Sequence, residues 1–309
     1  MTGAEGFIGS HLVQFLVRSG WSVTGGYRLH GAPCTSKHRN LRFVQCDLRN
    51  GQRVEQLLRE YRPGYIFHLA AQSLPIVSWV DPVDTFESNI MGSLHLFEAV
   101  RQMKRSAIVV SACSSAEYGD VPRSAIPVIE ETPLRPVHPY GISKVCLDLL
   151  GRQYFRDYGI PIVNLRLFNT TGPGKTNDAP SDFVRQLVRI KKGKQPGVIE
   201  VGNLKPRRAF LDVEDAVNGF YLAALKGNYG EVYNLCAAET HSIGEVLRVA
   251  LRLSGVKAKV RQASHLMRPS DERIIFGSTE KFRRHTGWYS QKSLQETIQS
   301  MLNYWDRFL

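Results

Sequence analysis

Cysteine is scarce in this sequence, and its five residues form no C-x-x-C pair. That spacing argues against a disulfide framework and against a zinc site. No apolar run approaches the roughly 18–20 residues that span a bilayer, and no basic and apolar leader precedes the glycine-rich stretch near the start. Repeats and low-complexity tracts are missing as well. We therefore expect a cytoplasmic protein with no metal site and no membrane partner.

Acidic residues are outnumbered, with 28 against 40 lysines and arginines, which gives a formal net charge of +12. A charge of this size is one mark of nucleic-acid binding. The basic residues are spread along the chain, however, and no basic stripe is interleaved with aromatic residues. We expect no nucleic-acid partner, and interpret the charge as a surface bias together with a site for a polyanionic small molecule.

Short apolar runs alternate with helical patterns over the first half of the chain. The patterns predict strands at residues 21–24, 43–46, 65–69, 107–110 and 162–166, and helices at 8–19, 54–61, 84–103 and 140–158. Strands separated by helices require crossovers, which indicates a parallel sheet. The Pro- and Gly-rich segment 170–180 marks the crossing into a second, less regular domain. We predict an α/β fold: a Rossmann-type doubly wound parallel sheet with a smaller, mixed α/β C-terminal substrate domain.

A glycine-rich segment opens the chain, with Gly3, Gly6 and Gly9 in the pattern G-x-x-G-x-x-G. Glycine permits a tight turn and a close approach of the backbone to a pyrophosphate. The first turn of the following helix, from Phe7 and Ile8, would offer its N–H groups to the phosphates. The alternative is an ordinary turn. Only Met1 precedes Thr2, where the segment begins, so the strand expected before it is missing. We expect a start assigned late or trimmed rather than a true loss.

The position expected to bind the cofactor ribose carries no acidic residue. In NAD enzymes an Asp or Glu about 20 residues further on binds the ribose hydroxyl. Here the strand ends in Gly25-Gly26-Tyr27-Arg28. Because an arginine can pair with a 2′-phosphate, we predict NADP rather than NAD. The alternative is that Arg28 is a solvated loop residue. Asp47, after the next strand, could accept a hydrogen bond from the adenine amino group or could cap its loop.

Tyr140 and Lys144 lie four residues apart, so they share one face of the predicted helix. A phenol with a pKa of about 10 is a poor acid–base catalyst at neutral pH. A nearby ammonium and an oxidised nicotinamide would lower that pKa. Ser114 adds a hydroxyl one strand and loop earlier. The three predict a catalytic group that moves a proton onto or off a sugar oxygen while hydride moves to or from a nicotinamide. The alternative is a structural role for the pair.

With these motifs the chain resembles the extended short-chain dehydrogenase/reductase (NAD-dependent epimerase/dehydratase) family, from Thr2 to its C-terminus. The marks are the glycine-rich segment, Asp47-Leu48, His68-Leu69-Ala70-Ala71, Asn89-Ile90-Met91-Gly92, Tyr118-Gly119, Tyr140-Gly141-Ile142-Ser143-Lys144, Phe168-Asn169, Gly172-Pro173-Gly174 and Phe210-Leu211-Asp212-Val213-Glu214-Asp215. It is similar in particular to the GDP-mannose branch, which contains GDP-mannose 4,6-dehydratase and GDP-6-deoxy-4-keto-mannose reductase. The marks of that branch are Val201-Gly202-Asn203-Leu204, Arg207-Arg208 and Arg268-Pro269-Ser270-Asp271.

The resemblance implies how the chain is divided and what its residues bind. A dinucleotide-binding domain would take residues 1–168 plus about 209–236, and a nucleotide-sugar-binding domain about 169–208 plus 237–309. Besides the glycine-rich segment and Arg28, the implied cofactor contacts are Asp47, Leu48, Leu69, Ala70, Ala71, Tyr140 and Lys144. The implied contacts with a GDP-sugar substrate are Gln72, Ser115, Ala116, Glu117, Asn169, Val201, Arg208, Arg268 and Asp271.

The resemblance also implies a homodimer, paired through the helices at 84–103 and 140–158. Apolar side chains on these helices would permit such a pairing, but they could equally face their own sheet. They are Leu94, Phe97, Val145, Leu149 and Phe155.

Ala116 departs from the dehydratase pattern. A 4,6-dehydratase removes the C5 proton with a carboxylate, which the family's dehydratases place three residues before the glycine of Tyr118-Gly119. Glu117 is adjacent, but neighbours on a strand-like segment point in opposite directions, unless the loop is turned. The remaining groups suit NADPH-dependent reduction of the C4 ketone of a GDP-4-keto-6-deoxyhexose. The alternatives are a GDP-mannose 4,6-dehydratase, a nucleotide-sugar C4 epimerase and a non-catalytic dinucleotide-binding module.

Overall fold

The computed structural model of the chain describes residues 1–28, 38–103, 106–267 and 274–309. They form two compact units. The first unit consists of residues 1–167, 217–235 and 279–288, and the second of residues 168–216, 236–278 and 289–309. These limits differ from the sequence-based ones, because 209–216 belongs to the second unit and 279–288 to the first.

The addition of residues 279–288 to the first unit has a packing reason. Helix α10 (Glu280–Thr286) lies beside strand β10 (Val232–Leu235). The buried Phe282 ring lies 5.1 Å from the Tyr233 ring, centre to centre, and Trp288 is buried behind it. Burial of two aromatic side chains holds this segment against the sheet of the first unit.

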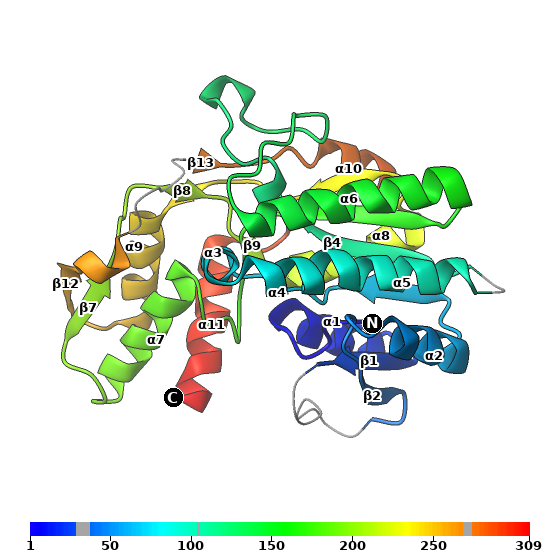
Figure 1. The fold of residues 1–309 in the computed structure, drawn as a ribbon. Helices are drawn as coiled ribbons and strands as arrows, with labels where there is room; N and C mark the ends of the chain where they lie inside the picture. Colours follow the sequence, from blue (N-terminus) through cyan, green and yellow to red (C-terminus); the bar gives the residue numbers. More distant parts are fainter. Residues whose placement is uncertain (29–37, 104–105, 268–273) are drawn as a thin grey trace. The chain divides into compact units, whose positions relative to one another are not determined.

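The first unit is built on parallel strands, as predicted (Figure 1). One set has the order β10-β5-β4-β3 and the other pairs β1 with β2. The bounds are β1 Val23–Tyr27, β2 Leu41–Gln45, β3 Tyr65–His68, β4 Ile108–Ser114 and β5 Ile162–Leu167. β5 is buried along its whole length, as expected of a strand covered on both faces.

Residues Met1–Ala4 join the two sets of strands. The Thr2 amide donates to the Phe67 carbonyl of β3 at 3.0 Å, and the Ala4 amide donates to the Gly26 carbonyl of β1 at 3.1 Å. Thr2 also pairs with His68 as an isolated parallel bridge. The residues before the glycine-rich loop thus lie between β1 and β3, where the strand missing from the sequence pattern is expected.

Helices cover both faces of this sheet. On one face, α2 (Gly51–Tyr61), α5 (Gly92–Arg101) and α6 (Pro139–Tyr158) share a buried core with β3, β4 and β5. On the other face, α1 (Phe7–Arg18) contacts α8 (Val213–Lys226), where the Phe15 and Tyr221 rings lie 5.3 Å apart. This two-faced cover is that of a doubly wound α/β sheet.

The helix expected at 84–103 is present at 82–101 and contains a π-helical turn. α3 (Pro75–Val80) and α4 (Pro82–Phe86) precede a π-helical turn at Glu87–Met91, and α5 follows. Each of the first two begins with proline, which suits the first helical position. The π turn leaves Asn89 facing the interior, where it is buried. Such turns are frequent at functional sites.

The second unit is mixed α/β. Its helices α7 (Ala179–Lys191), α9 (Ile243–Ser254) and α11 (Leu294–Phe308) pack around one apolar core that includes Val201. Its strands are β6 Thr170–Thr171, β7 Val198–Val201, β8 Arg207–Arg208, β9 Leu211–Asp212, β11 His241–Ser242, β12 Lys259–Gln262 and β13 Ile274–Ile275. In the described part of the chain, no helix is both long and apolar enough to cross a membrane.

Candidate active site

The glycine-rich loop folds into a tight turn ahead of α1. The Gly6 amide donates to the Gly3 carbonyl at 3.1 Å, and Gly3 has a φ of +65°. A Cβ on Gly9 would overlap the Gly3 oxygen, and a Cβ on Gly3 would lie 2.7 Å from the Ala70 nitrogen. The turn therefore requires glycine. α1 begins at Phe7 with no side-chain cap and no acid in its first turn. Its N–H groups suit the pyrophosphate of a dinucleotide, so the cradle fits the predicted cofactor.

Two arginines follow the carboxyl ends of β1 and β2. Nη1 of Arg28 donates to Ser88 Oγ at 3.2 Å and lies 3.9 Å from Asp84 Oδ1. Nη1 of Arg49 lies 3.1 Å from the same Asp84 oxygen, and the Arg49 guanidinium also pairs with Asp47 at 2.6 Å. The side chains of Arg28 and Arg49 are 42% and 39% exposed. This partly exposed pair of guanidinium groups suits a 2′-phosphate.

Asp47 and Leu48 have structural roles of their own. Asp47 Oδ1 accepts the backbone N–H of Arg49 at 3.0 Å, so Asp47 caps its loop, which is one of the two roles considered for it. Its hydrogen bonds with Arg49 lower the pKa of Asp47. Leu48 is buried in the core, and its carbonyl accepts a hydrogen bond from His95 Nδ1 at 2.8 Å. The cofactor contacts of both residues stay predictions.

The chain that follows β3 is fixed by buried polar groups. The Ala70 amide donates to Thr2 Oγ1 at 3.2 Å. The Gln72 amide donates to Asn89 Oδ1 at 2.7 Å, and Asn89 Nδ2 donates back to the Gln72 carbonyl at 2.9 Å. The same Nδ2 also donates to Ser143 Oγ on α6 at 2.9 Å. Asn89 therefore ties the loop of Ala70 to Gln72 to the helix of the predicted catalytic pair.

The Gln72 side chain is occupied within its own loop. Its Nε2 donates to the Leu74 carbonyl and to Thr85 Oγ1, each at 3.1 Å, and its Oε1 accepts the Leu74 amide at 2.6 Å. Both hydrogens of Nε2 are used, so a substrate contact that replaces no bond would have to donate to the second lone pair of Oε1. Gln72 thus holds the entry to α3 and keeps one acceptor position for a substrate hydroxyl.

Ser114 ends β4 and caps the 3₁₀ turn Ser115–Glu117. Ser114 Oγ accepts the Ala116 amide at 3.2 Å, and the Ser114 amide donates to Glu117 Oε1 at 2.8 Å. Glu117 has no exposed surface, and its Oε2 accepts from Arg166 Nε at 2.9 Å. The turn thus directs the Glu117 carboxylate back into the interior. For that reason we leave Glu117 out of the proposed substrate-binding set.

Helix α6 brings Tyr140 and Lys144 to the same end of β4. His138 caps the helix, because its Nδ1 accepts the Gly141 amide at 2.9 Å. A Cβ on Gly141 would lie 2.7 Å from the Ala116 carbonyl oxygen. The glycine that follows Tyr140 therefore lets the first turn of α6 approach the turn that carries Ser114.

The three predicted catalytic side chains converge. Lys144 Nζ donates to the Ala112 carbonyl of β4 at 2.7 Å and lies 5.8 Å from the centre of the Tyr140 ring. Burial raises the pKa of Tyr140 to about 12, although a hydrogen bond with the Ser114 side chain acts in the opposite direction. Burial lowers the pKa of Lys144, while Cys113 and Glu117 oppose that change. The phenol is therefore protonated at neutral pH, in the form that donates a proton.

The remaining predicted substrate residues belong to the second unit. Asn169 is exposed, and its carbonyl accepts the Leu211 amide at 2.9 Å. Arg208 lies in β8, where its Nη1 donates to the Arg207 carbonyl at 2.8 Å. Val201 is buried in the apolar core of that unit. Arg268 and Asp271 lie outside the described residues.

Sequence reasoning gave no role to several residues that hold this site together. Arg49, Asn89, Asp148 and Arg166 contact the loops and the helix of the predicted cofactor and catalytic residues. One signal was present, since Arg166 is an ionisable residue within the apolar run of a buried strand. A charge at such a position requires partners.

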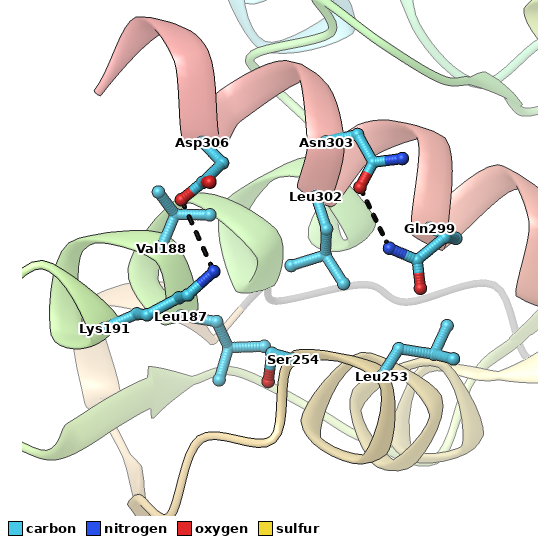
Figure 2. Close-up of a pocket in the computed structure, with 9 residues that line it drawn as sticks. All are labelled: Leu187, Val188, Lys191, Leu253, Ser254, Gln299, Leu302, Asn303 and Asp306. Atoms are coloured by element: carbon cyan, nitrogen blue, oxygen red, sulfur yellow. Dashed lines mark hydrogen bonds and ion pairs between the residues drawn. The ribbon is translucent and has the colours of Figure 1, made fainter.

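A pocket in the second unit carries no catalytic arrangement. Figure 2 shows that its polar groups pair with one another: Lys191 with Asp306 at 3.6 Å, and Gln299 with Asn303 at 3.0 Å. The pocket lies between α7, α9 and α11. Its lining residues are Leu187, Val188, Lys191, Leu253, Ser254, Gln299, Leu302, Asn303 and Asp306.

Known proteins are similar to this chain in sequence and in fold. The sequence model of the GDP-mannose 4,6-dehydratase family matches residues 1–301. GDP-6-deoxy-D-mannose reductase of Pseudomonas aeruginosa is 28% identical over 309 residues, which cover 99% of this chain and 96% of that protein. The structure of RMD from Pseudomonas aeruginosa complexed with NADPH superimposes with a TM-score of 0.86 at 27% identity, over 99% of this chain and 98% of that one.

An epimerase structure is similar to the same degree. UDP-glucose 4-epimerase of Thermus thermophilus, in complex with NAD, has a TM-score of 0.87 at 31% identity and covers 98% of this chain and 97% of that one. The family match spans almost the whole sequence and agrees with the parallel sheet, the glycine cradle and the tyrosine–lysine helix. The chain therefore belongs to the GDP-mannose 4,6-dehydratase family of extended short-chain dehydrogenases/reductases.

Proposed function

We propose that this protein reduces the C4 ketone of a GDP-4-keto-6-deoxyhexose with NADPH. The relative from Pseudomonas aeruginosa is named for a reductase of a GDP-6-deoxyhexose, and a structure of RMD from that organism was determined with NADPH. Of the substrate residues that the resemblance implies, we leave out Glu117 and Val201, which are buried. The others would be Gln72, Ser115, Ala116, Asn169, Arg208, Arg268 and Asp271.

One observation carries the choice of reduction over dehydration. The dehydratases of this family place a carboxylate at the position of Ala116, and Glu117 next to it turns its carboxylate inward to Arg166. Neither residue of this turn therefore supplies a base for the C5 proton. Loss of a positioned general base costs on the order of 10²–10⁴ in rate. Reduction at C4 needs no such base, because only a hydride and a proton are added.

The side chains of the first unit divide this chemistry. The nicotinamide supplies the hydride when it is bound. Tyr140 donates the proton to the developing C4 oxyanion, and its raised pKa keeps the phenol in the donating form. Ser114 Oγ accepts the Ala116 amide, and its O–H, which bonds the Tyr140 phenol in the structure, would donate to the same C4 oxygen when substrate is bound. The Lys144 ammonium, held by Ala112, stabilises the phenolate that remains.

NADP(H) is the cofactor that the polar groups beside β1 favour. Arg28 and Arg49 would face the 2′-phosphate, and the Asp84 carboxylate near both guanidinium groups would hold them in place. The glycine cradle and the first turn of α1 would bind the pyrophosphate. Ala70 and Ala71, together with Tyr140 and Lys144, would line the nicotinamide end.

A homodimer is the assembly that the exposed helix faces support. Leu149 on α6 is 54% exposed, whereas Phe97 is fully buried in the core and so faces its own sheet. The apolar side chains of Val80 on α3 and Val83 on α4 are exposed as well. Sedimentation of the protein and of Leu149→Asp would test the pairing. We expect a dimer that the substitution dissociates, and a monomeric parent protein would contradict it.

The proposed function is tested by product analysis and NADPH absorbance on GDP-, CDP-, dTDP- and UDP-linked 4-keto-6-deoxysugars and on their parent sugars. We expect stoichiometric oxidation of NADPH with the GDP-linked 4-keto sugar and no conversion of GDP-mannose. Conversion of GDP-mannose with no net change in cofactor would instead establish a dehydratase.

C4 epimerisation is a second candidate, because it needs the same three catalytic groups and because the epimerase structure is so similar. An epimerase keeps its cofactor through the cycle. Interconversion of two C4 epimers with no consumption of NADPH would favour it over the reductase.

A further inference from the structure

A buried ionic cluster lies directly beneath the proposed catalytic group. Glu117 and Asp148 have fully buried side chains, and the Arg166 side chain between them is 1% exposed. Burial of three charged groups is costly unless each is paired. Arg166 Nε lies 2.9 Å from Glu117 Oε2 and 3.0 Å from Asp148 Oδ2, and its Nη2 also pairs with Asp148.

Each carboxylate of this cluster leads to a different part of the active site. Glu117 Oε1 accepts the backbone N–H of Ser114 at 2.8 Å. Asp148 lies on α6, four residues after Lys144 and eight after Tyr140, so the three share one helix face. Arg166 therefore connects the turn that carries the hydroxyl to the helix that carries the phenol and the ammonium.

The pairing of β4 with β5 determines where along the strands this connection lies. In the parallel register of β4 and β5, Arg166 is opposite Cys113, the residue before Ser114. A series of hydrogen bonds thus connects four buried residues, in the order Ser114, Glu117, Arg166 and Asp148. A displacement of either end would alter the distance between the hydroxyls of Ser114 and Tyr140.

We propose that Glu117 and Arg166 are positioning residues, which hold the Ser114 turn in register with the Tyr140 helix for proton transfer. This inference rests on the proposed function, since it assumes that Ser114 and Tyr140 act on one oxygen. A misplacement of about 1 Å by a change away from the chemistry can cost on the order of 10²-fold in rate. The cluster thus affects kcat more than it affects binding of the cofactor.

Two variants of Glu117 separate positioning from packing. Glu117→Leu keeps the volume approximately but removes both bonds of the carboxylate. Glu117→Gln keeps an oxygen for the Ser114 amide but turns an N–H group toward Arg166 Nε. The matched control is Tyr118→Phe, because Tyr118 OH also accepts from Arg166, at 2.9 Å, and is equally buried, but its hydroxyl bonds Asn234 rather than Ser114.

The test measures kcat, KM for NADPH and thermal midpoint for the three variants and the parent protein. We expect kcat to fall on the order of 10²-fold in Glu117→Leu and several-fold in Glu117→Gln, but less than about twofold in Tyr118→Phe. KM for NADPH should stay within about threefold in all of them. If Glu117→Leu does not fold, the difference between Glu117→Gln and Tyr118→Phe decides. Equal values of kcat in those two variants would overturn the proposal.

A second readout does not depend on the substrate. Hydrogen exchange of the Ser114 amide should be slow in the parent protein, in Glu117→Gln and in Tyr118→Phe, and fast in Glu117→Leu. If the parent protein reduces no 4-keto sugar while the exchange follows this order, the proposed function is wrong. In that case Glu117 still fixes the Ser114 turn. Unchanged exchange in a folded Glu117→Leu variant would refute that role of Glu117.

Discussion

The Lys144 ammonium lies 5.8 Å from the centre of the Tyr140 ring and donates a hydrogen bond to β4 at Ala112. This hydrogen bond fixes the lysine side chain near the end of β4, where Ser114 lies. Its positive charge faces the ring that would become a phenolate after proton transfer. This relationship explains why the proton donor and its stabilising charge come from one helix face.

Tyr140→Phe should abolish turnover and leave NADPH affinity nearly unchanged. The substitution removes the proton donor but keeps the ring, and loss of a positioned acid costs on the order of 10²–10⁴ in rate. Single-turnover oxidation of NADPH measures the first effect and fluorescence titration the second. Retention of parental activity would exclude Tyr140 as the acid.

The rate of reduction should not fall on the alkaline side of neutrality. Only the protonated phenol can donate, and burial raises the pKa of Tyr140 to about 12. The donating form is thus complete well above neutral pH, and kcat should stay level across about pH 6–9. A kcat profile, recorded at saturating substrate, tests this. A loss of kcat centred near neutrality would contradict a proton donor with so high a pKa.

Arg28→Asp should shift the cofactor preference toward NADH. The change replaces the guanidinium that we propose binds the 2′-phosphate with a carboxylate that can accept ribose hydroxyls. We expect the ratio of kcat/KM for NADPH to that for NADH to fall by about tenfold or more, since a charged hydrogen bond contributes about 1.5–3 kcal/mol. Arg42→Asp is the control, because Arg42 lies near the start of β2, over the Tyr61 ring. An unchanged ratio in Arg28→Asp would remove Arg28 from the cofactor site.

Gly9→Ala should destabilise the first unit and weaken dinucleotide binding together. A Cβ at this position overlaps the Gly3 carbonyl, so either the loop or α1 must move. We expect the free energy of unfolding to fall by about 2–4 kcal/mol, measured by denaturant titration. Gly64→Ala is the control, because a Cβ there meets nothing within 4 Å. A Gly9→Ala protein with parental stability and NADPH affinity would contradict the close approach.

The parallel sheet and the shared helix face of Tyr140 and Lys144 could be predicted because both follow from the spacing of residues along the chain. Alternating apolar runs and helical patterns predicted the parallel sheet, and the four-residue spacing predicted that Tyr140 and Lys144 share a helix face. Both expectations rest on the spacing of residues along the chain, which can be read without knowledge of tertiary contacts.

The orientation of individual side chains depends on tertiary partners, and there the sequence was insufficient. Glu117 was considered as if on an extended segment, but a 3₁₀ turn and the distant Arg166 direct it inward. The apolar side chains of Phe97 and Leu149 looked equivalent, yet the first is buried and the second exposed. The π turn that buries Asn89 has no periodic signature that could have been recognised beforehand.

The central claim is reduction at C4 by the parent protein, and it is tested most directly by the stoichiometry of a single reaction. NADPH and a GDP-4-keto-6-deoxyhexose are mixed with the enzyme, and absorbance and product mass are followed together. We predict that one NADPH is oxidised for each product formed, and that the product gains the mass of one hydride and one proton. Product formation without NADPH oxidation, or conversion of GDP-mannose in its place, would contradict the account.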